Sequence, residues 1–108
     1  MAAMNQAEWL ALAGLIKLMK DADGVVTLKE HRTVGKLASR MGSKLWEALA
    51  LAERDLDSEA AIRRQAAKVR PQSQALVRGA LEELALADGL AEPEQELLAW
   101  LDELWASA

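Results

Sequence analysis

The 108-residue chain contains no cysteine, no tyrosine and no phenylalanine, and His31 is its single histidine. Without cysteine, the chain forms neither a disulfide framework nor a thiolate metal site. With one histidine, it has few of the side chains from which catalytic triads and zinc hydrolase sites are built. It also lacks a glycine-rich loop of the kind that binds phosphates. We therefore expect a protein that binds a partner or ligand and is not an enzyme.

Long apolar runs are also missing. Lys17, Lys20 and Asp21 interrupt the best candidate, so no stretch reaches the roughly 18 residues of a membrane span. The first residues carry no cluster of positive charge, and Glu8 lies inside their apolar stretch, which is not the pattern of a signal peptide. We expect a soluble, cytoplasmic protein without membrane insertion.

The charge pattern argues against nucleic acid as a partner. The formal net charge is −4, and residues 79–108 carry eight acidic side chains and no basic one. Such an acidic segment repels phosphate groups and attracts cations or basic protein surfaces. We therefore expect no nucleic acid partner.

Apolar residues make up 52% of the chain, recur at helical spacing almost everywhere, and nowhere alternate as they do in a strand. The predicted fold is all-α, a compact bundle of about six helices that forms one domain over residues 1–108. The first helix is expected over residues 6–20. The second is expected to end at Gly42, and the fifth at Asp88-Gly89, because glycine readily takes the conformation that ends a helix.

Short sequence signals mark where helices begin. The expected N-caps are Thr27, Ser43 and either Asp57 or Ser58. Glu30, three residues after Thr27, completes a capping box. Pro71 and Pro93 fit the first turns of the fifth and sixth helices, where a missing N–H group costs nothing.

A shift of 65 residues superimposes the two ends of the sequence. It places Ala22-Asp23-Gly24 on Ala87-Asp88-Gly89, and Gly14 on Gly79. Each half then consists of a helix, an Asp-Gly turn and a capped helix. We predict two pseudo-repeats, about residues 6–42 and 71–106, linked by two short helices.

The two Asp-Gly turns carry the candidate metal ligands. If the turns lie side by side, they pool the carboxylates of Asp21, Asp23, Glu30, Asp88 and Glu92. Oxygen ligands of this kind suit a divalent cation such as calcium, magnesium or manganese, and the sequence indicates no other cofactor. An EF-hand loop is disfavoured, because its first position, normally aspartate, falls on Met19.

The paired turns and the capping boxes that follow them resemble the tellurite-resistance TerB family and similar domains of DnaJ-type co-chaperones. The matching segments are Ala22-Asp23-Gly24-Val25-Val26-Thr27-Leu28-Lys29-Glu30 and Ala87-Asp88-Gly89-Leu90-Ala91-Glu92-Pro93-Glu94-Gln95. The resemblance thins over residues 43–70. It implies a compact helical fold, a role in bacterial stress response or defence, and divalent-metal binding through Asp23, Glu30 and Asp88. Gln95 departs from the pattern, leaving Glu94 or Glu96 as substitutes.

A second interpretation stays open, in which the Asp-Gly turns are only helix caps and the chain is a protein-interaction domain. The second helix carries a basic stripe, Lys29, Arg32, Lys36 and Arg40. Such a stripe can dock on an acidic protein partner or on the acidic half of a second copy. Among the tryptophans, Trp46 and Trp105 are expected in the core, and Trp9 and Trp100 at its edge.

Overall fold

The structure, a computed structural model, describes residues 4–21, 28–86 and 92–106. These residues form the helices α1 (Gln6–Asp21), α2 (Leu28–Met41), α3 (Ser43–Asp55), α4 (Glu59–Ala66), α5 (Pro71–Leu86) and α6 (Glu92–Ala106). Within the described ranges there is no strand. The predicted all-α bundle of about six helices is confirmed.

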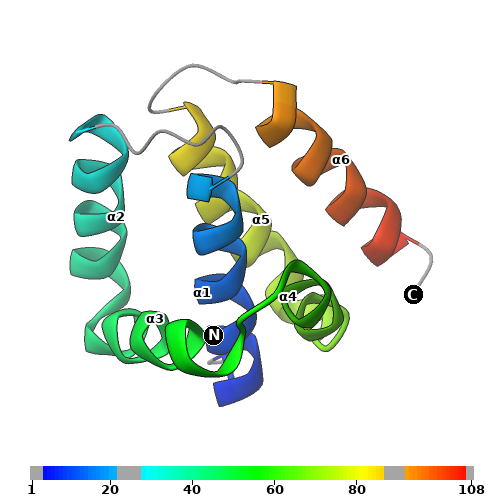
Figure 1. Cartoon of the computed structure of the whole chain (residues 1–108), viewed down its shortest axis with the longest axis horizontal. Helices are drawn as coiled ribbons and strands as arrows, with labels where there is room; N and C mark the ends of the chain where they lie inside the picture. Colours follow the sequence, from blue (N-terminus) through cyan, green and yellow to red (C-terminus); the bar gives the residue numbers. More distant parts are fainter. Residues whose placement is uncertain (1–3, 22–27, 87–91, 107–108) are drawn as a thin grey trace.

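Helix α1 is the centre of the bundle (Figure 1). It packs against α3, α4, α5 and α6, while α2 packs against α3 and α5. Helices α3 and α4 lie across one end of the bundle, where α2 ends and α5 begins. The predicted internal repeat remains a prediction. In the part of the chain that the structure describes, no helix combines the length and apolarity needed to cross a membrane.

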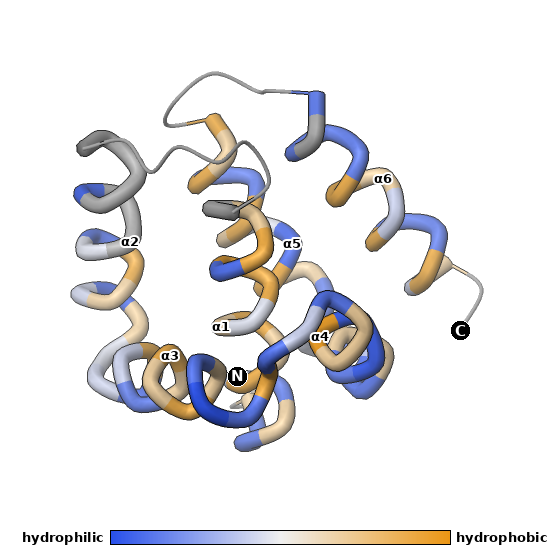
Figure 2. Tube along the Cα trace, viewed as in Figure 1, coloured by the Kyte–Doolittle hydropathy of each residue, from blue (hydrophilic) through white to orange (hydrophobic). Residues whose placement is uncertain are grey.

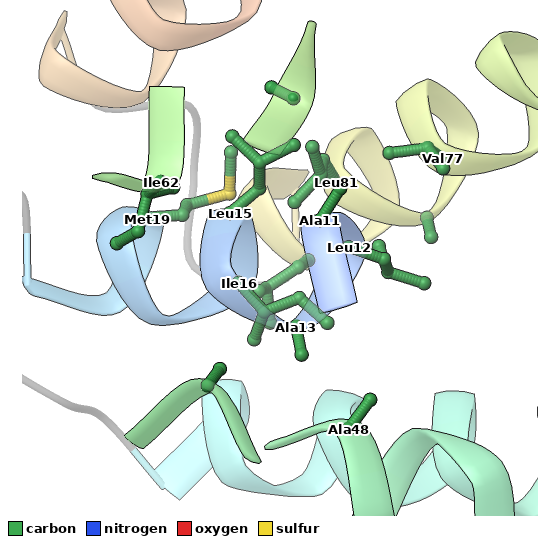
Figure 3. Packing of buried hydrophobic residues seen from close by; sticks show 14 of the residues in the cluster. Ala11, Leu12, Ala13, Leu15, Ile16, Met19, Ala48, Ile62, Val77 and Leu81 are labelled. Carbon is green, nitrogen blue, oxygen red and sulfur yellow. The ribbon is translucent and has the colours of Figure 1, made fainter. Parts of the chain in front are cut away.

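The central position of α1 follows from its sequence, which is apolar on nearly all sides. Residues from Ala11 to Ile16 are all buried, and a helix of this kind is stable only when other elements surround it. Figure 3 shows side chains from α3, α4 and α5 around it. In Figure 2, the hydrophobic residues of the outer helices lie mainly on the sides that face α1. Gly14 lets the Leu56 side chain pack directly against the backbone of α1, because a Cβ added at this position would lie 2.7 Å from the Leu56 Cδ1 atom.

Helix α6 is fastened to its neighbours by two surface contacts in addition to its leucines. The Arg63 guanidinium of α4 lies 4.3 Å from the centroid of the Trp100 ring, a cation–π contact. Arg78 of α5 donates from Nε to Asp102 Oδ1 at 3.0 Å. These contacts orient α6 along α5.

The predicted starts of α4 and α5 are confirmed and that of α3 is wrong, while Thr27, the predicted cap of the second helix, lies outside the described residues. Ser58 caps α4, accepting a hydrogen bond from the Ala61 N–H at 3.1 Å, and Pro71 begins α5. The prediction that Ser43 is an N-cap is wrong. Gly42 holds that position with a φ of 92°, so Ser43 becomes the first helical residue and the cap has no side-chain hydrogen bond.

Trp9 and Trp100 follow the predictions, whereas Trp105, expected in the core, is half-buried and packs against the core from outside. Trp9 and Trp100 are half-buried at the edge of the core, and the Trp105 Nε1 donates to the Ala66 carbonyl at 3.1 Å. The prediction of a core Trp46 is wrong, since this side chain is 55% exposed. The buried face of α3 runs instead through Leu45, Ala48 and Ala52, which places Trp46 on the outer side.

Candidate functional site

The predicted metal ligands fall at or beyond the limits of the described structure. Asp23 and Asp88 lie outside the described residues. Asp21 is the last residue of α1 and Glu30 belongs to the first turn of α2, but the structure does not describe their side chains. Glu92 begins α6 and is exposed. The ligand set therefore remains a prediction.

The helix ends next to the two predicted turns share one end of the bundle. There α1 and α5 end, and α2 and α6 begin (Figure 1). Among the described side chains, no group of three or more His, Asp or Glu residues could hold a metal ion. Glu94, the proposed substitute ligand, is 2% exposed and belongs to the interior, whereas Glu96 is exposed.

Met19 is 1% exposed in α1. The position where an EF-hand loop needs its first carboxylate is therefore occupied by a core side chain. This agrees with the sequence argument against such a loop.

A strongly perturbed ionisable group lies elsewhere, at the start of α1. Asn5 and Glu8 form a capping box, in which the Glu8 N–H donates to Asn5 Oδ1 at 2.8 Å and the Asn5 N–H donates to Glu8 Oε1 at 2.9 Å. The Glu8 side chain is fully buried. Arg70, just before α5, holds its carboxylate with Nη2 on Oε1 at 2.8 Å and Nε on Oε2 at 2.9 Å.

These donors fix the charge of Glu8. The pKa of Glu8 is lowered from 4.5 to about 2. The largest cause is hydrogen bonding by the Arg70 side chain; the backbone N–H groups of Asn5 and Arg70 and the Ser73 side chain add to it, and together they outweigh the opposite effect of burial. At about 1.4 kcal/mol per pKa unit, the ionised carboxylate stabilises the fold by about 3 kcal/mol. Glu8 is thus held as an anion at neutral pH.

Two neighbouring hydrogen bonds extend this arrangement, which we call the Glu8–Arg70 latch. Gln65 of α4 donates from Nε2 to the Ala7 carbonyl at 3.0 Å, and Trp105 of α6 donates to the adjacent Ala66. The latch therefore ties the start of α1 to the α4–α5 connection and to α6. The sequence analysis missed it, although the Asn5-x-x-Glu8 spacing is that of a capping box.

An open groove runs between α2 and α5. Its apolar part has a volume of about 420 Å³ and is lined by Leu37, Arg40, Met41, Ala75, Leu76, Gly79, Ala80 and Glu83. A second hollow of about 560 Å³ shares Arg40 and Glu83 and continues over Arg32, Gly35, Lys36 and Ser39. We call the two together the α2–α5 groove. Leu76, in its wall, is 48% exposed.

The α2 side of this groove is basic. Of the predicted stripe, Arg32, Lys36 and Arg40 are exposed as expected, and the structure does not describe the side chain of Lys29. Arg40 forms an ion pair across the groove with Glu83 of α5. Arg32 and Lys36 pair with no carboxylate that the structure describes. The groove therefore carries a local positive charge on a protein whose formal net charge is −4.

Two glycines in the groove have no role in the packing of the bundle. Gly35 of α2 and Gly79 of α5 both lie inside their helices, and a Cβ added to either would meet nothing within 4 Å. Glycine inside a helix costs about 1 kcal/mol relative to alanine. Gly14 differs, because neighbouring side chains need its space.

Comparison with known protein families, with curated proteins and with solved structures finds no match to this chain.

Proposed function

We propose that this chain is a non-enzymatic protein-binding module whose binding site is the α2–α5 groove. The observation that carries the proposal is the groove itself, with an exposed leucine in its wall and two glycines that leave it open. Of the large apolar side chains that are exposed among the described residues, Trp46, Leu76 and Leu86, Leu76 lines this groove. Exposed apolar side chains beside a groove are typical of a surface that a partner covers.

The non-enzymatic character is part of the proposal. A strongly shifted pKa often marks a catalytic group, and here that group is Glu8. Its carboxylate oxygens accept hydrogen bonds from Asn5 and Arg70 inside the protein, and the side chain is fully buried. The shift therefore has a structural cause.

The biological setting proposed for this module comes from its resemblance to the TerB family, which implies a stress-response or defence assembly. A six-helix bundle agrees with that resemblance, but bundles of this size occur in many families. The link to tellurite rests on the same resemblance and remains a proposal. The cytoplasmic location, expected from the charge and apolar pattern of the sequence, also remains a proposal.

Site-specific photocrosslinking tests the protein-binding function. A photoreactive amino acid replaces Leu76 in the groove, and in a control chain it replaces Arg64, an exposed residue of α4. In the cells from which the gene comes, we expect one discrete crosslinked protein at position 76 that is absent at position 64. The same products at both positions would contradict the proposal.

A second function, divalent-metal binding, is favoured by one observation. The helix ends that flank both Asp-Gly turns lie at the same end of the bundle. Carboxylates drawn together there would repel one another, and a bound cation would relieve that repulsion.

Thermal unfolding of metal-stripped protein tests this second function. A cation at a hundred times its dissociation constant stabilises the fold by about 2.7 kcal/mol, which raises Tm by several degrees. We expect a rise with calcium, magnesium or manganese that the double variant Asp23→Ala, Asp88→Ala loses while it keeps its helical spectrum. Equal Tm values with and without all three cations would leave the turns as helix caps.

A further inference from the structure

We infer that the partner enters the α2–α5 groove as an amphipathic helix with acidic flanks, its apolar face on α5 and its acidic side chains on α2. This inference rests on the proposed protein-binding function and specifies the chemistry of the partner. It follows from three properties of the groove: its shape, its open backbone and its unbalanced charge.

The shape of the groove suits a helix. It is bounded by two packed helices, with Leu37 and Ala80 buried at its base and Leu76 exposed in its wall. From Ala75 to Glu83 the wall extends for about 12 Å at the helical rise of about 1.5 Å per residue. A helix of about nine residues covers that length and one of roughly ten to fourteen residues extends beyond it, with apolar side chains at every third or fourth position.

The two glycines of the groove let the backbone of a bound partner lie close to the backbones of α2 and α5. Because Gly35 and Gly79 carry no side chain and no neighbour fills the space above them, a helix laid in the groove approaches α2 and α5 more closely than it would over alanine. Gly79 lies in the apolar hollow and Gly35 in the basic one. Each part of the groove therefore has one helical position without a side chain, and the Arg40–Glu83 ion pair lies where the two parts meet.

The charge selects acidic side chains. Arg32 and Lys36 are one helical turn apart on α2, both exposed and both without an ion pair to any carboxylate described in the structure. Elsewhere Arg63, Arg70 and Arg78 each pair with a carboxylate, whereas Lys44, Arg64 and Lys68 are exposed and, among the described residues, form no ion pair. What distinguishes Arg32 and Lys36 is that they lie beside the hollow. Glutamates on the flank of a docked helix would neutralise the two unpaired cations and would strengthen and orient the complex.

Three synthetic peptides test the inference on the full chain. Each is helical, about fourteen residues long, fluorescein-labelled, and carries leucines on one face. The flanking positions are glutamate in the first, glutamine in the second and lysine in the third. By fluorescence anisotropy, we expect the glutamate peptide to bind about tenfold more tightly than the glutamine peptide, and the lysine peptide to bind most weakly. The advantage of the glutamate peptide should shrink as salt screens the charges.

Two matched double variants locate the charge effect. Arg32→Glu with Lys36→Glu reverses the cations of the groove, and we expect it to reverse the order of the three peptides. Arg64→Glu with Lys68→Glu makes the same change in net charge at exposed residues on and just beyond α4. We expect this control to leave the order unchanged.

The outcomes separate the inference from the proposed function. If the three peptides bind equally and the Gly79→Leu variant binds none of them, the groove is a binding site but its partner is not acidic, and the inference is overturned. If Gly79→Leu binds the peptides as the wild type does, or if no peptide binds at all, the inference is also overturned. In that case the crosslinking experiment at position 76 alone tests the proposed function. Sedimentation showing a dimer that Gly79→Leu dissociates would make a second copy of the chain the occupant, which also overturns the inference.

Discussion

The Glu8–Arg70 latch and the α2–α5 groove have opposite physical characters. In the latch, a buried charge meets donors from its own chain. In the groove, an apolar side chain and two cations remain at the surface, and two helical positions lack a side chain. Groups of the first kind stabilise the folded chain by itself. Groups of the second kind gain their stabilisation from a second molecule.

Removing the charge of Glu8 is the change with the largest expected effect. Glu8→Gln keeps the capping-box geometry but loses the ionic bond to Arg70, and we expect the free energy of unfolding to fall by about 3 kcal/mol. Chemical denaturation at neutral pH measures it. The control is Glu53→Gln, which removes an exposed carboxylate 3.6 Å from Lys17. Surface pairs of this kind contribute little, so equal losses in the two variants would contradict the role of the latch.

Acid should weaken the latch in a defined pH range. Because the pKa of Glu8 is lowered to about 2 from 4.5, its stabilisation is complete above pH 4.5 and disappears as the pH falls towards 2. We expect the stability difference between the wild-type chain and Glu8→Gln to narrow over this range. Denaturation curves for both proteins at several pH values measure it. A difference that stays constant down to pH 2 would show that Glu8 is not the titrating group.

Filling Gly14 should also destabilise the bundle. Leucine at this position would push against Leu56 and Ile62, whose atoms already lie 2.7 and 3.3 Å from an added Cβ. Overpacking of this kind costs about 1–3 kcal/mol. Thermal unfolding should show a lower Tm for Gly14→Leu. An unchanged Tm would mean that α1 and α4 can separate without loss of stability.

The groove glycines should behave in the opposite way. Gly35→Ala and Gly79→Ala each add a methyl group in open space, and we expect each to raise the free energy of unfolding by about 0.5–1 kcal/mol. Chemical denaturation of the single variants and of their combination checks this, with additive gains expected. A loss of stability in either variant would mean that the fold needs the glycine.

The two regions also differ in how far the sequence predicts them. The six helices, the Ser58 cap and the basic stripe follow from residues close together in the chain, and so does the box of Asn5 and Glu8. The partner of Glu8 does not, since Arg70 lies 62 residues away and only the packing of α1 against the α4–α5 connection brings it near.

The groove was predictable only in part for the same reason. Arg32, Lys36 and Arg40 mark one face of α2, but their position beside Leu76 and Gly79 depends on the pairing of α2 with α5. The prediction of a core Trp46 is wrong because α3 has apolar residues on more than one face. In the packed bundle the face with Leu45 and Ala48 is buried. Asp23 and Asp88 lie outside the described residues, so their role stays a prediction.

The central claim is that the open space in the α2–α5 groove serves to bind a partner and is not needed for the stability of the fold. Gly79→Leu tests it most directly, with chemical denaturation and crosslinking yield from position 76 measured on the same variant. The claim predicts a chain at least as stable as the wild type that no longer captures its partner. A stable Gly79→Leu chain with full crosslinking yield would contradict it.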